Sequence, residues 1–142
     1  MTTLITGSSG LIGRNLVSRL HDEGESLVCM DLDLKATPSI DGVELVQGDI
    51  TNYENVLDVI SNYKPDKIVH LAYLVGKGAL EDLSLSLRVN LLGVDNVFRA
   101  SVQQDVSRVV WASTLGVYSS LDYESNLTVT EDSPRPYSPY TA

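Results

Sequence analysis

The sequence is poor in cysteine, in aromatic residues and in positive charge, and it lacks a long hydrophobic run. Its 142 residues contain one cysteine, Cys29, so an internal disulfide is excluded and a reducing compartment is expected. Ten Lys and Arg stand against 19 Asp and Glu, and the net charge of −9 disfavours a nucleic-acid partner. No apolar stretch approaches the roughly 20 residues of a membrane span. An apolar run begins almost at Met1, so the sequence predicts no signal peptide and a cytoplasmic chain without a membrane partner.

What the sequence does contain is a regular alternation of apolar runs and amphipathic segments. Short apolar runs predict strands at residues 3–6, 27–31, 43–46, 67–72 and 108–113. Helical spacing of apolar residues predicts helices at 11–20, 53–60 and 83–104, with Gly24 after the first and Thr51 or Asn52 capping the second. Near-continuous apolar strands separated by helices indicate a doubly wound α/β fold with a parallel sheet covered on both faces. The polar segment from 114 onward is expected to be loop.

Three glycines spaced by three follow the first expected strand. Gly7 allows a sharp turn, Gly10 lets a pyrophosphate approach the backbone, and Gly13 lets the next helix pack close to the strand. The helix N-terminus adds unpaired N–H groups and a partial positive charge, which attract an anion. The motif predicts a dinucleotide site, but a tight turn that needs these glycines for packing alone is the other interpretation.

Acidic residues follow the next two strands. Asp31 is placed to accept hydrogen bonds from the adenosine ribose and, with Asp33, to repel a 2′-phosphate, which favours NAD over NADP. Lys35 is a nearby cation that a phosphate could still use. Asp49 and Ile50 suit an adenine ring, since the carboxylate of Asp49 would bind the exocyclic amine and the apolar side chain of Ile50 would pack on the face of the ring. The alternatives are that Asp31 is a solvated loop acid and that Asp49 only starts the next helix.

The other polar residues within apolar elements have plainer interpretations. His70 is a candidate general base, but a histidine hydrogen-bonded locally at the rim of the sheet is preferred. Asn90, inside the long helix, is expected to bond to a neighbouring strand or loop, and Cys29 is expected in the core. A Ser-His-Asp hydrolase is disfavoured, because the sequence has no G-x-S-x-G motif and its two histidines lie early in the chain.

Six motifs along the sequence resemble those of the extended short-chain dehydrogenase/reductase superfamily, in its NAD-dependent epimerase/dehydratase branch. The resemblance covers the whole chain, and the motifs follow the family's order and spacing. They are the turn at 6–13, Asp31, Gly48-Asp49-Ile50, His70-Leu71-Ala72, Asn90 with Gly93, and Ser113-Thr114 with Tyr118. In addition, Ser138-Pro139-Tyr140 is similar to the opening of the family's Y-x-x-x-K motif, whose lysine would fall two residues past Ala142.

The resemblance implies NAD as the cofactor and assigns roles to particular residues. Cofactor contacts are implied for Gly7, Ser9, Gly10, Leu11, Ile12, Gly13, Asp31, Asp49, Ile50, Leu71, Ala72, Tyr73, Asn90, Ser113 and Tyr140, and no metal is expected. Thr114 and Tyr140 are the implied catalytic residues. In the family the tyrosine takes a proton from a substrate hydroxyl while the nicotinamide accepts a hydride, and Thr114 would hydrogen-bond the same hydroxyl.

The resemblance also implies that residues 1–142 are the NAD-binding, N-terminal part of a longer enzyme without its substrate-binding lobe. The fold implied is an incomplete Rossmann-type sheet of about five strands in the order 3-2-1-4-5. The parent protein is expected to be a homodimer acting on a small molecule, a nucleotide sugar, and the chain alone is expected to be inactive. Two alternatives stay open, which are a non-catalytic nucleotide-binding sensor or scaffold and an α/β domain that binds no nucleotide.

Overall fold

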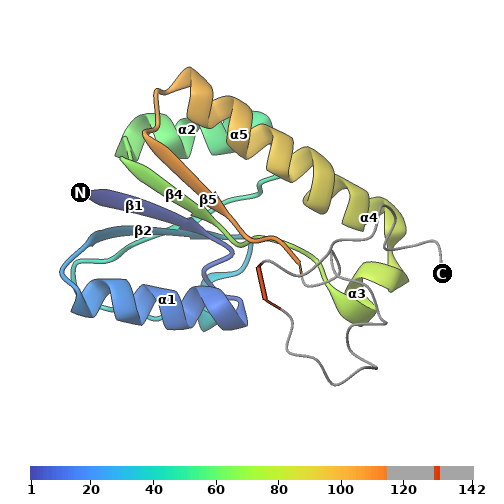
Figure 1. Cartoon of the computed structure of the whole chain (residues 1–142), viewed down its shortest axis with the longest axis horizontal. Coiled ribbons are helices and arrows are strands. Elements are labelled where there is room, and N and C mark those ends of the chain that lie inside the picture. The colour runs from blue at the N-terminus through green and yellow to red at the C-terminus, as the bar shows by residue number, and fades with distance from the viewer. Residues whose placement is uncertain (115–129, 132–142) are drawn as a thin grey trace. The chain divides into compact units, whose positions relative to one another are not determined.

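Five parallel strands form one sheet in the order β3-β2-β1-β4-β5 (Figure 1). The strands are β1 (Thr2–Thr6), β2 (Ser26–Asp31), β3 (Glu44–Gln47), β4 (Lys67–His70) and β5 (Arg108–Trp111). Successive strands on each side of β1 are linked through helices or turns, as the sequence predicts. The doubly wound α/β fold and its strand order are thereby confirmed.

The structure is a computed structural model that describes residues 1–114 and 130–131. The chain divides into two compact units, Met1–Trp111 and Ala112–Ala142. The first unit holds the whole sheet and its helices. In the second unit, the described residues 112–114 and 130–131 form neither helix nor strand. No helix within the described part of the chain combines the length and the apolar character needed to cross a membrane.

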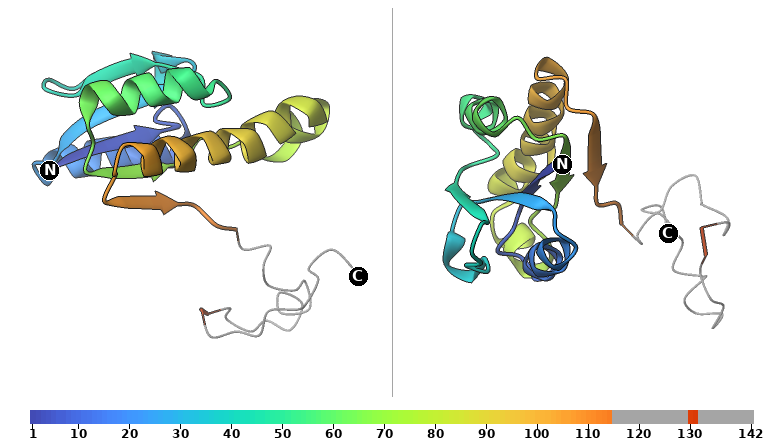
Figure 2. Two further views of the ribbon diagram at one scale, coloured as in Figure 1. Left: turned by 90° about the horizontal axis from the view of Figure 1, so that it is seen from above. Right: turned by 90° about the vertical axis from the view of Figure 1, so that its left-hand side faces the viewer.

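Helices cover both faces of the sheet (Figure 2). α1 (Leu11–Asp22) lies on one face, and α2 (Tyr53–Tyr63) and α5 (Val94–Gln103) lie on the other. The remaining elements follow strand ends or precede α5; they are the 3₁₀ turn η1 (Leu34–Ala36), α3 (Gly76–Glu81), α4 (Leu83–Leu87) and the π-helical turn η2 (Arg88–Gly93). Asn52 caps α2 by accepting a hydrogen bond from the Asn55 N–H, and Gly24, with φ +81°, follows the end of α1.

Alternate residues of each strand divide between two hydrophobic clusters, because successive side chains of a strand point to opposite faces. Leu4 and Ile68 belong to the cluster under α2 and α5, whereas Ile5 and Val69 belong to the cluster under α1. Cys29 lies in the second cluster, fully buried, and burial raises the pKa of its thiol to about 12. It is therefore an unreactive core residue, as expected.

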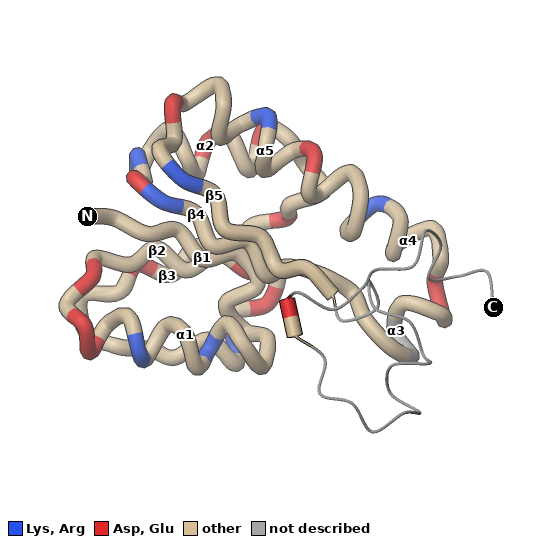
Figure 3. The backbone as a smooth tube through the Cα atoms, in the orientation of Figure 1, with Lys and Arg blue, Asp and Glu red and all other residues tan. Residues whose placement is uncertain are grey.

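Charged residues of the sheet stand at the ends of strands rather than in their middles (Figure 3). Glu44, Lys67 and Arg108 begin their strands, and Asp31 ends β2. The middle of the sheet is thus free of charge, as burial on both faces demands. Asp31 stands out for that reason, since it is the one carboxylate that ends a strand of this described sheet.

The strands predicted at 67–72 and 108–113 are each two residues shorter in the structure. His70 pairs with Thr6, the last residue of β1, and Trp111 pairs with His70. Beyond Thr6 the chain turns at Gly7, whose φ is +74°, so the ladder has no partner to continue on. Ala72 and Ser113 therefore lie outside the strands, which corrects the sequence prediction.

The single helix predicted over 83–104 is divided into α4, η2 and α5. The backbone stays helical at both junctions, since Arg88 and Val94 have right-handed helical angles, so the predicted span is right and its regularity is wrong. The wider π turn is the difference, and such turns inside helices often mark functional positions. The sequence does not predict the short helix α3, because its six residues carry no helical repeat of apolar side chains.

Candidate functional site

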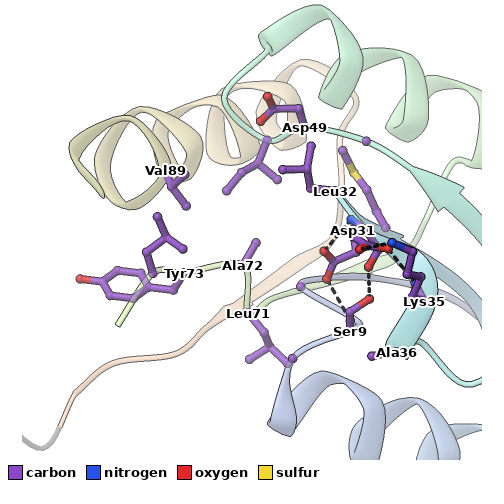
Figure 4. Close-up of a pocket in the computed structure, with 17 residues that line it drawn as sticks. Ser9, Asp31, Leu32, Lys35, Ala36, Asp49, Leu71, Ala72, Tyr73 and Val89 are labelled. Carbon is purple, nitrogen blue, oxygen red and sulfur yellow. Dashed lines mark hydrogen bonds and ion pairs between the residues drawn. The ribbon is translucent and has the colours of Figure 1, made fainter. Parts of the chain in front are cut away.

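A pocket of about 520 Å³ opens at the carboxyl ends of the strands (Figure 4). Its walls come from the glycine turn, the end of β2, the segment after β3, the segment after β4 and the turn η2. Nine residues predicted as cofactor contacts line it together: Gly7, Ser9, Gly10, Asp31, Asp49, Ile50, Leu71, Ala72 and Tyr73. Parallel sheets bind their ligands at this edge. All of the described residues that line the pocket belong to the first unit.

The two interpretations of the glycine turn apply to different glycines. A Cβ at Gly7 would lie 2.5 Å from the Ala72 nitrogen, and one at Gly13 would overlap the Gly7 carbonyl oxygen. These two glycines are therefore needed for packing. A Cβ at Gly10 would have only the Gly7 oxygen nearby, at 3.2 Å, so the space beside this backbone is open to a ligand.

Leu11, Ile12 and Gly13 begin α1 and do not line the pocket. The first hydrogen bond of the helix runs from the Arg14 N–H to the Gly10 carbonyl, at 3.0 Å. The N–H groups of the three residues before Arg14 consequently have no helical acceptor. They form a site that attracts an anion at the end of α1 nearest the glycine turn.

The Asp31 carboxylate is held by two backbone N–H groups. Its Oδ2 accepts from the Ser9 N–H at 2.9 Å, and its Oδ1 accepts from the Asp33 N–H at 3.3 Å. The side chain is half-buried and lines the pocket, so it is not simply a solvated loop acid. Figure 4 shows the Asp31 side chain beside Ser9, to which it is hydrogen-bonded.

Asp33 contacts Lys35, the one cation among the described residues that line the pocket. Its Oδ1 accepts from the Lys35 N–H at 3.0 Å, and its Oδ2 lies 3.4 Å from the Lys35 ammonium. The backbone hydrogen bond from Lys35 lowers the pKa of the Asp33 carboxyl, which keeps it charged. The sequence leaves Lys35 open as a receptor for a 2′-phosphate, and in the structure it is paired with an acid.

Asp49 is both a pocket residue and a local structural one. Its Oδ1 accepts from the Thr51 N–H at 2.8 Å, and its own N–H donates to Asn55 at 2.7 Å. Ile50, 6% exposed, is fixed from the other side, because its carbonyl accepts from Asn96 at 2.9 Å and its side chain packs against Gly93. The interpretation of Asp49 as an adenine contact is therefore compatible with its interpretation as a residue that helps to start α2.

His70 is hydrogen-bonded locally, as preferred from the sequence. Its Nδ1 lies 2.6 Å from the Thr6 hydroxyl, and the ring is 1% exposed. Burial lowers the pKa of the imidazole to about 4, so the ring is neutral near pH 7. Its Nε2 has no hydrogen-bond partner among the described residues. A solvent-linked general base would need access that this ring does not have.

Asn90 makes the predicted link to a neighbouring loop. Its Oδ1 accepts from the Leu74 N–H at 2.8 Å, and its Nδ2 donates to the Leu74 carbonyl at 2.9 Å. The amide thus fastens η2 to the segment after β4 without lining the pocket itself. Sequence reasoning missed five apolar residues that do line it, Met30, Leu32, Ala36, Leu74 and Val89. The signal for Leu32 and Val89 was their place beside Asp31 and Asn90.

Three predicted site residues do not belong to the first unit. Ser113 and Thr114 are exposed residues of the second unit, and Ser113 follows the end of β5 instead of ending it. Tyr140 lies outside the described residues. The described part of the chain contains no cluster of acidic, histidine or cysteine side chains suited to a metal ion.

Comparison with known proteins matches residues 3–142 to the model of the NAD dependent epimerase/dehydratase family. UDP-glucose 4-epimerase of Mycolicibacterium smegmatis is 32% identical over all of this chain and 47% of its own length. CDP-paratose 2-epimerase of Salmonella typhi is 31% identical over 92% of this chain and 42% of its own. The Thermus thermophilus UDP-glucose 4-epimerase, solved with NAD, superposes with a TM-score of 0.76 at 31% identity, covering 99% of this chain and 46% of that one.

The chain therefore spans less than half the length of these curated relatives. The matched region carries the glycine turn, Asp31 and the pocket described above. On the match of the family model over nearly every residue, the chain belongs to the NAD-dependent epimerase/dehydratase family of short-chain dehydrogenases/reductases.

Proposed function

We propose that this chain is the NAD-binding, N-terminal part of an oxidoreductase that acts on a nucleotide sugar. The observation that carries the proposal is a single pocket that joins the open backbone of Gly10 to the fixed carboxylate of Asp31. A pyrophosphate and an adenosine ribose need these two features side by side. Relatives named as a UDP-glucose 4-epimerase and a CDP-paratose 2-epimerase support the class of substrate.

The residues of the pocket fit the adenosine half of NAD. The α1 N-terminus with its free N–H groups would hold the pyrophosphate, and Asp31 would accept hydrogen bonds from the ribose hydroxyls. Asp49 and Ile50 would flank the adenine, and Leu71, Ala72 and Tyr73 would form the wall that follows β4. The bound nicotinamide would supply hydride transfer at a substrate carbon.

The catalytic residues of this proposal lie beyond the first unit. Thr114 would hydrogen-bond the reacting hydroxyl, and Tyr140 would take its proton. An isolated tyrosine has a pKa near 10, so Tyr140 needs a neighbouring cation to ionise near neutrality. The family's lysine would provide that cation two residues past Ala142. We therefore propose that the 142-residue chain binds NAD and has no turnover.

The experiment that tests the binding proposal is a calorimetric titration of the chain with NAD. We expect saturable binding, and we expect Asp31→Ala to raise the dissociation constant on the order of tenfold or more, because ribose hydrogen bonds to a charged acceptor are lost. Absence of binding in the folded wild-type chain would contradict the proposal. Turnover of UDP-glucose by the chain would contradict the proposed inactivity.

The second candidate is a non-catalytic nucleotide sensor or scaffold. The observation that favours it is that the described residues that line the pocket all belong to the first unit and include neither Ser113 nor Thr114. The two codons that follow Ala142 in the parent gene distinguish the candidates. A lysine at the second codon supports the enzyme, and any other residue supports the sensor or scaffold.

A homodimer and a cytoplasmic location complete the proposal for the parent protein. Leu83, Leu87 and Leu91 are 66%, 50% and 62% exposed along α4 and η2. Large apolar side chains exposed in a row favour burial against another surface. Sedimentation of the full-length parent protein would distinguish a dimer from a monomer.

A further inference from the structure

We propose that Thr37 is a positioning residue of the cofactor site. Its hydroxyl fastens the segment that carries Asp31 and Asp33 to the glycine turn, so the ribose-binding carboxylate is set before the cofactor arrives. Thr37 follows η1 and is not one of the residues that line the pocket. The inference rests on the proposed NAD-binding function.

The hydroxyl groups of Ser8, Thr37 and Ser9 form a chain of hydrogen bonds between the glycine turn and the segment after β2. The Ser9 hydroxyl donates to the Asp33 carbonyl at 2.5 Å. A hydroxyl has one proton to donate, so the bond of 2.7 Å between Ser9 and Thr37 must run from the Thr37 hydroxyl to Ser9. Because the Thr37 hydroxyl donates its one proton to Ser9, it must accept in its other bond, from the Ser8 hydroxyl at 3.0 Å. Thr37 thus bonds to both serines of the glycine turn.

The Thr37 hydroxyl lies where water cannot easily replace its partners. Thr37 is 7% exposed and Ser8 is fully buried. A buried polar group that loses its partner bears the cost of desolvation, and hydrogen bonds in such surroundings are stronger than those in water. The Thr37 N–H also closes η1 by donating to the Leu34 carbonyl at 3.0 Å, so its backbone is fixed as well.

The hydroxyl chain ends on the two residues that aim the Asp31 carboxylate. One carboxylate oxygen accepts from the Ser9 N–H and the other from the Asp33 N–H. Ser9 belongs to the glycine turn and Asp33 to the segment after β2, and the Ser9 hydroxyl joins the two directly by donating to the Asp33 carbonyl. The Thr37 hydroxyl donates to the Ser9 hydroxyl and so fixes the direction in which Ser9 donates. Figure 4 shows the carboxylate facing Ser9 in the wall of the pocket. A receptor group fixed in advance lowers the ordering cost of binding.

The test compares NAD with an NAD analogue that lacks the adenosine 2′-hydroxyl, titrated against the 142-residue chain. In the wild type we expect NAD to bind on the order of tenfold more tightly than the analogue, because Asp31 accepts from that hydroxyl. Thr37→Val keeps the size of the side chain and removes its hydroxyl. We expect it to weaken NAD binding several-fold and to reduce the preference for NAD by the same factor, while Thr37→Ser restores both.

Two further variants separate positioning from general stability. Thr3→Val removes another buried threonine hydroxyl, which donates to Glu25 at 2.5 Å at the opposite end of β1. We expect this control to lower the melting temperature and leave the preference unchanged. Ser8→Ala removes only the donor to Thr37, and we expect a smaller loss of preference than in Thr37→Val.

The outcome that overturns the inference is a Thr37→Val chain with the wild-type preference, whatever its melting temperature. A Thr37→Val chain that does not fold leaves Thr37→Ala and Ser8→Ala as the deciding variants, and a wild-type preference in both overturns it equally. Amide exchange of Ser9 in the ligand-free chain gives an independent readout, since its N–H should exchange faster without the Thr37 hydroxyl. A wild-type chain that binds no NAD instead overturns the proposed function itself.

Discussion

Asp33 limits what Lys35 can bind in the pocket, where we propose that the adenosine of NAD lies. The ammonium of Lys35 lies 3.4 Å from the Asp33 carboxylate, and Lys35 lines the pocket. A 2′-phosphate would have to compete with this carboxylate and would meet the negative charge of Asp31. The pair is exposed, so the attraction within it is modest and salt-dependent.

We expect Asp33→Asn to narrow the preference for NAD over NADP by about twofold to fivefold, since an exposed ion pair is weakened by solvent and salt. The asparagine would still cap η1 through its side-chain oxygen, which makes the change a test of charge alone. Titration with both cofactors at low salt measures the ratio. The double variant Asp33→Asn, Lys35→Gln is the control and should regain most of the preference; an unchanged ratio in Asp33→Asn would contradict the role of the pair.

The buried His70 should make the folded chain less stable as the pH falls. Its pKa is about 4 in the folded chain against 6.5 without burial, so the unfolded chain binds the proton first as the pH falls. The folded state is favoured above pH 6.5, and this contribution is lost progressively between pH 6.5 and 4. Between pH 7.5 and 5 the free energy of unfolding should fall by about 2 kcal/mol from this residue.

Urea unfolding at the two pH values measures this effect, with His70→Gln as the non-titrating comparison. Glu25 contributes in a different window. A hydrogen bond from Thr3 and then one from Lys67 lower the pKa of its carboxyl, so its contribution is lost only as the pH falls below about 4.5. Equal pH dependence in the wild type and His70→Gln between pH 7.5 and 5 would contradict the assignment to His70.

At the scale of elements, the π turn η2 supports the segment that follows β4. Asn90 forms both hydrogen bonds to the backbone of Leu74, as a neighbouring strand would. The segment that follows β4 has no ladder partner after Thr6, so this amide replaces the sheet as its support. Leu71, Ala72 and Tyr73 therefore keep their place in the pocket wall.

We expect Asn90→Ala to lower the free energy of unfolding by about 1–3 kcal/mol, because it leaves a half-buried backbone N–H and carbonyl without partners. Hydrogen exchange at Leu74 should accelerate more than exchange in β1. Asn15→Ala is the matched control, since the Asn15 amide makes one bond, to the Leu11 carbonyl, at an exposed site. A loss of stability no larger in Asn90→Ala than in Asn15→Ala would exclude the supporting role.

The same scale shows what the sequence could and could not predict. The strands, their order and the acids at their ends follow from apolar runs and family motifs, because burial on both faces leaves few other residues in β2 or β4. Where a strand stops was not predictable, since the end of β4 is set by Gly7 after β1, a contact distant in sequence. The hydroxyl chain through Thr37 was missed for the same reason: its partners lie 28 and 29 residues away.

At the scale of the whole molecule, the chain divides into two units, and we predict from this division which part of the chain binds each half of the cofactor. Every described residue that lines the pocket lies between Met1 and Trp111, whereas the sequence predicts Ser113 and Tyr140 as cofactor contacts from outside this unit. The adenosine half of the cofactor should therefore depend on the first unit alone. Any contribution of Ser113 or Tyr140 should change the affinity for the nicotinamide half of the cofactor.

A chain ending at Thr114 should bind ADP-ribose, which lacks the nicotinamide, within about twofold of the 142-residue chain, because it keeps every described residue of the pocket. Affinity for NAD should fall by more than affinity for ADP-ribose if Tyr140 touches the nicotinamide end. Calorimetry with both ligands on both chains gives the comparison, and far-ultraviolet circular dichroism checks that the shorter chain keeps its sheet. A tenfold loss of ADP-ribose affinity, about 1.4 kcal/mol, in a folded shorter chain would show that residues 115–142 contribute to the adenosine site, and the site would then have to be redrawn across both units.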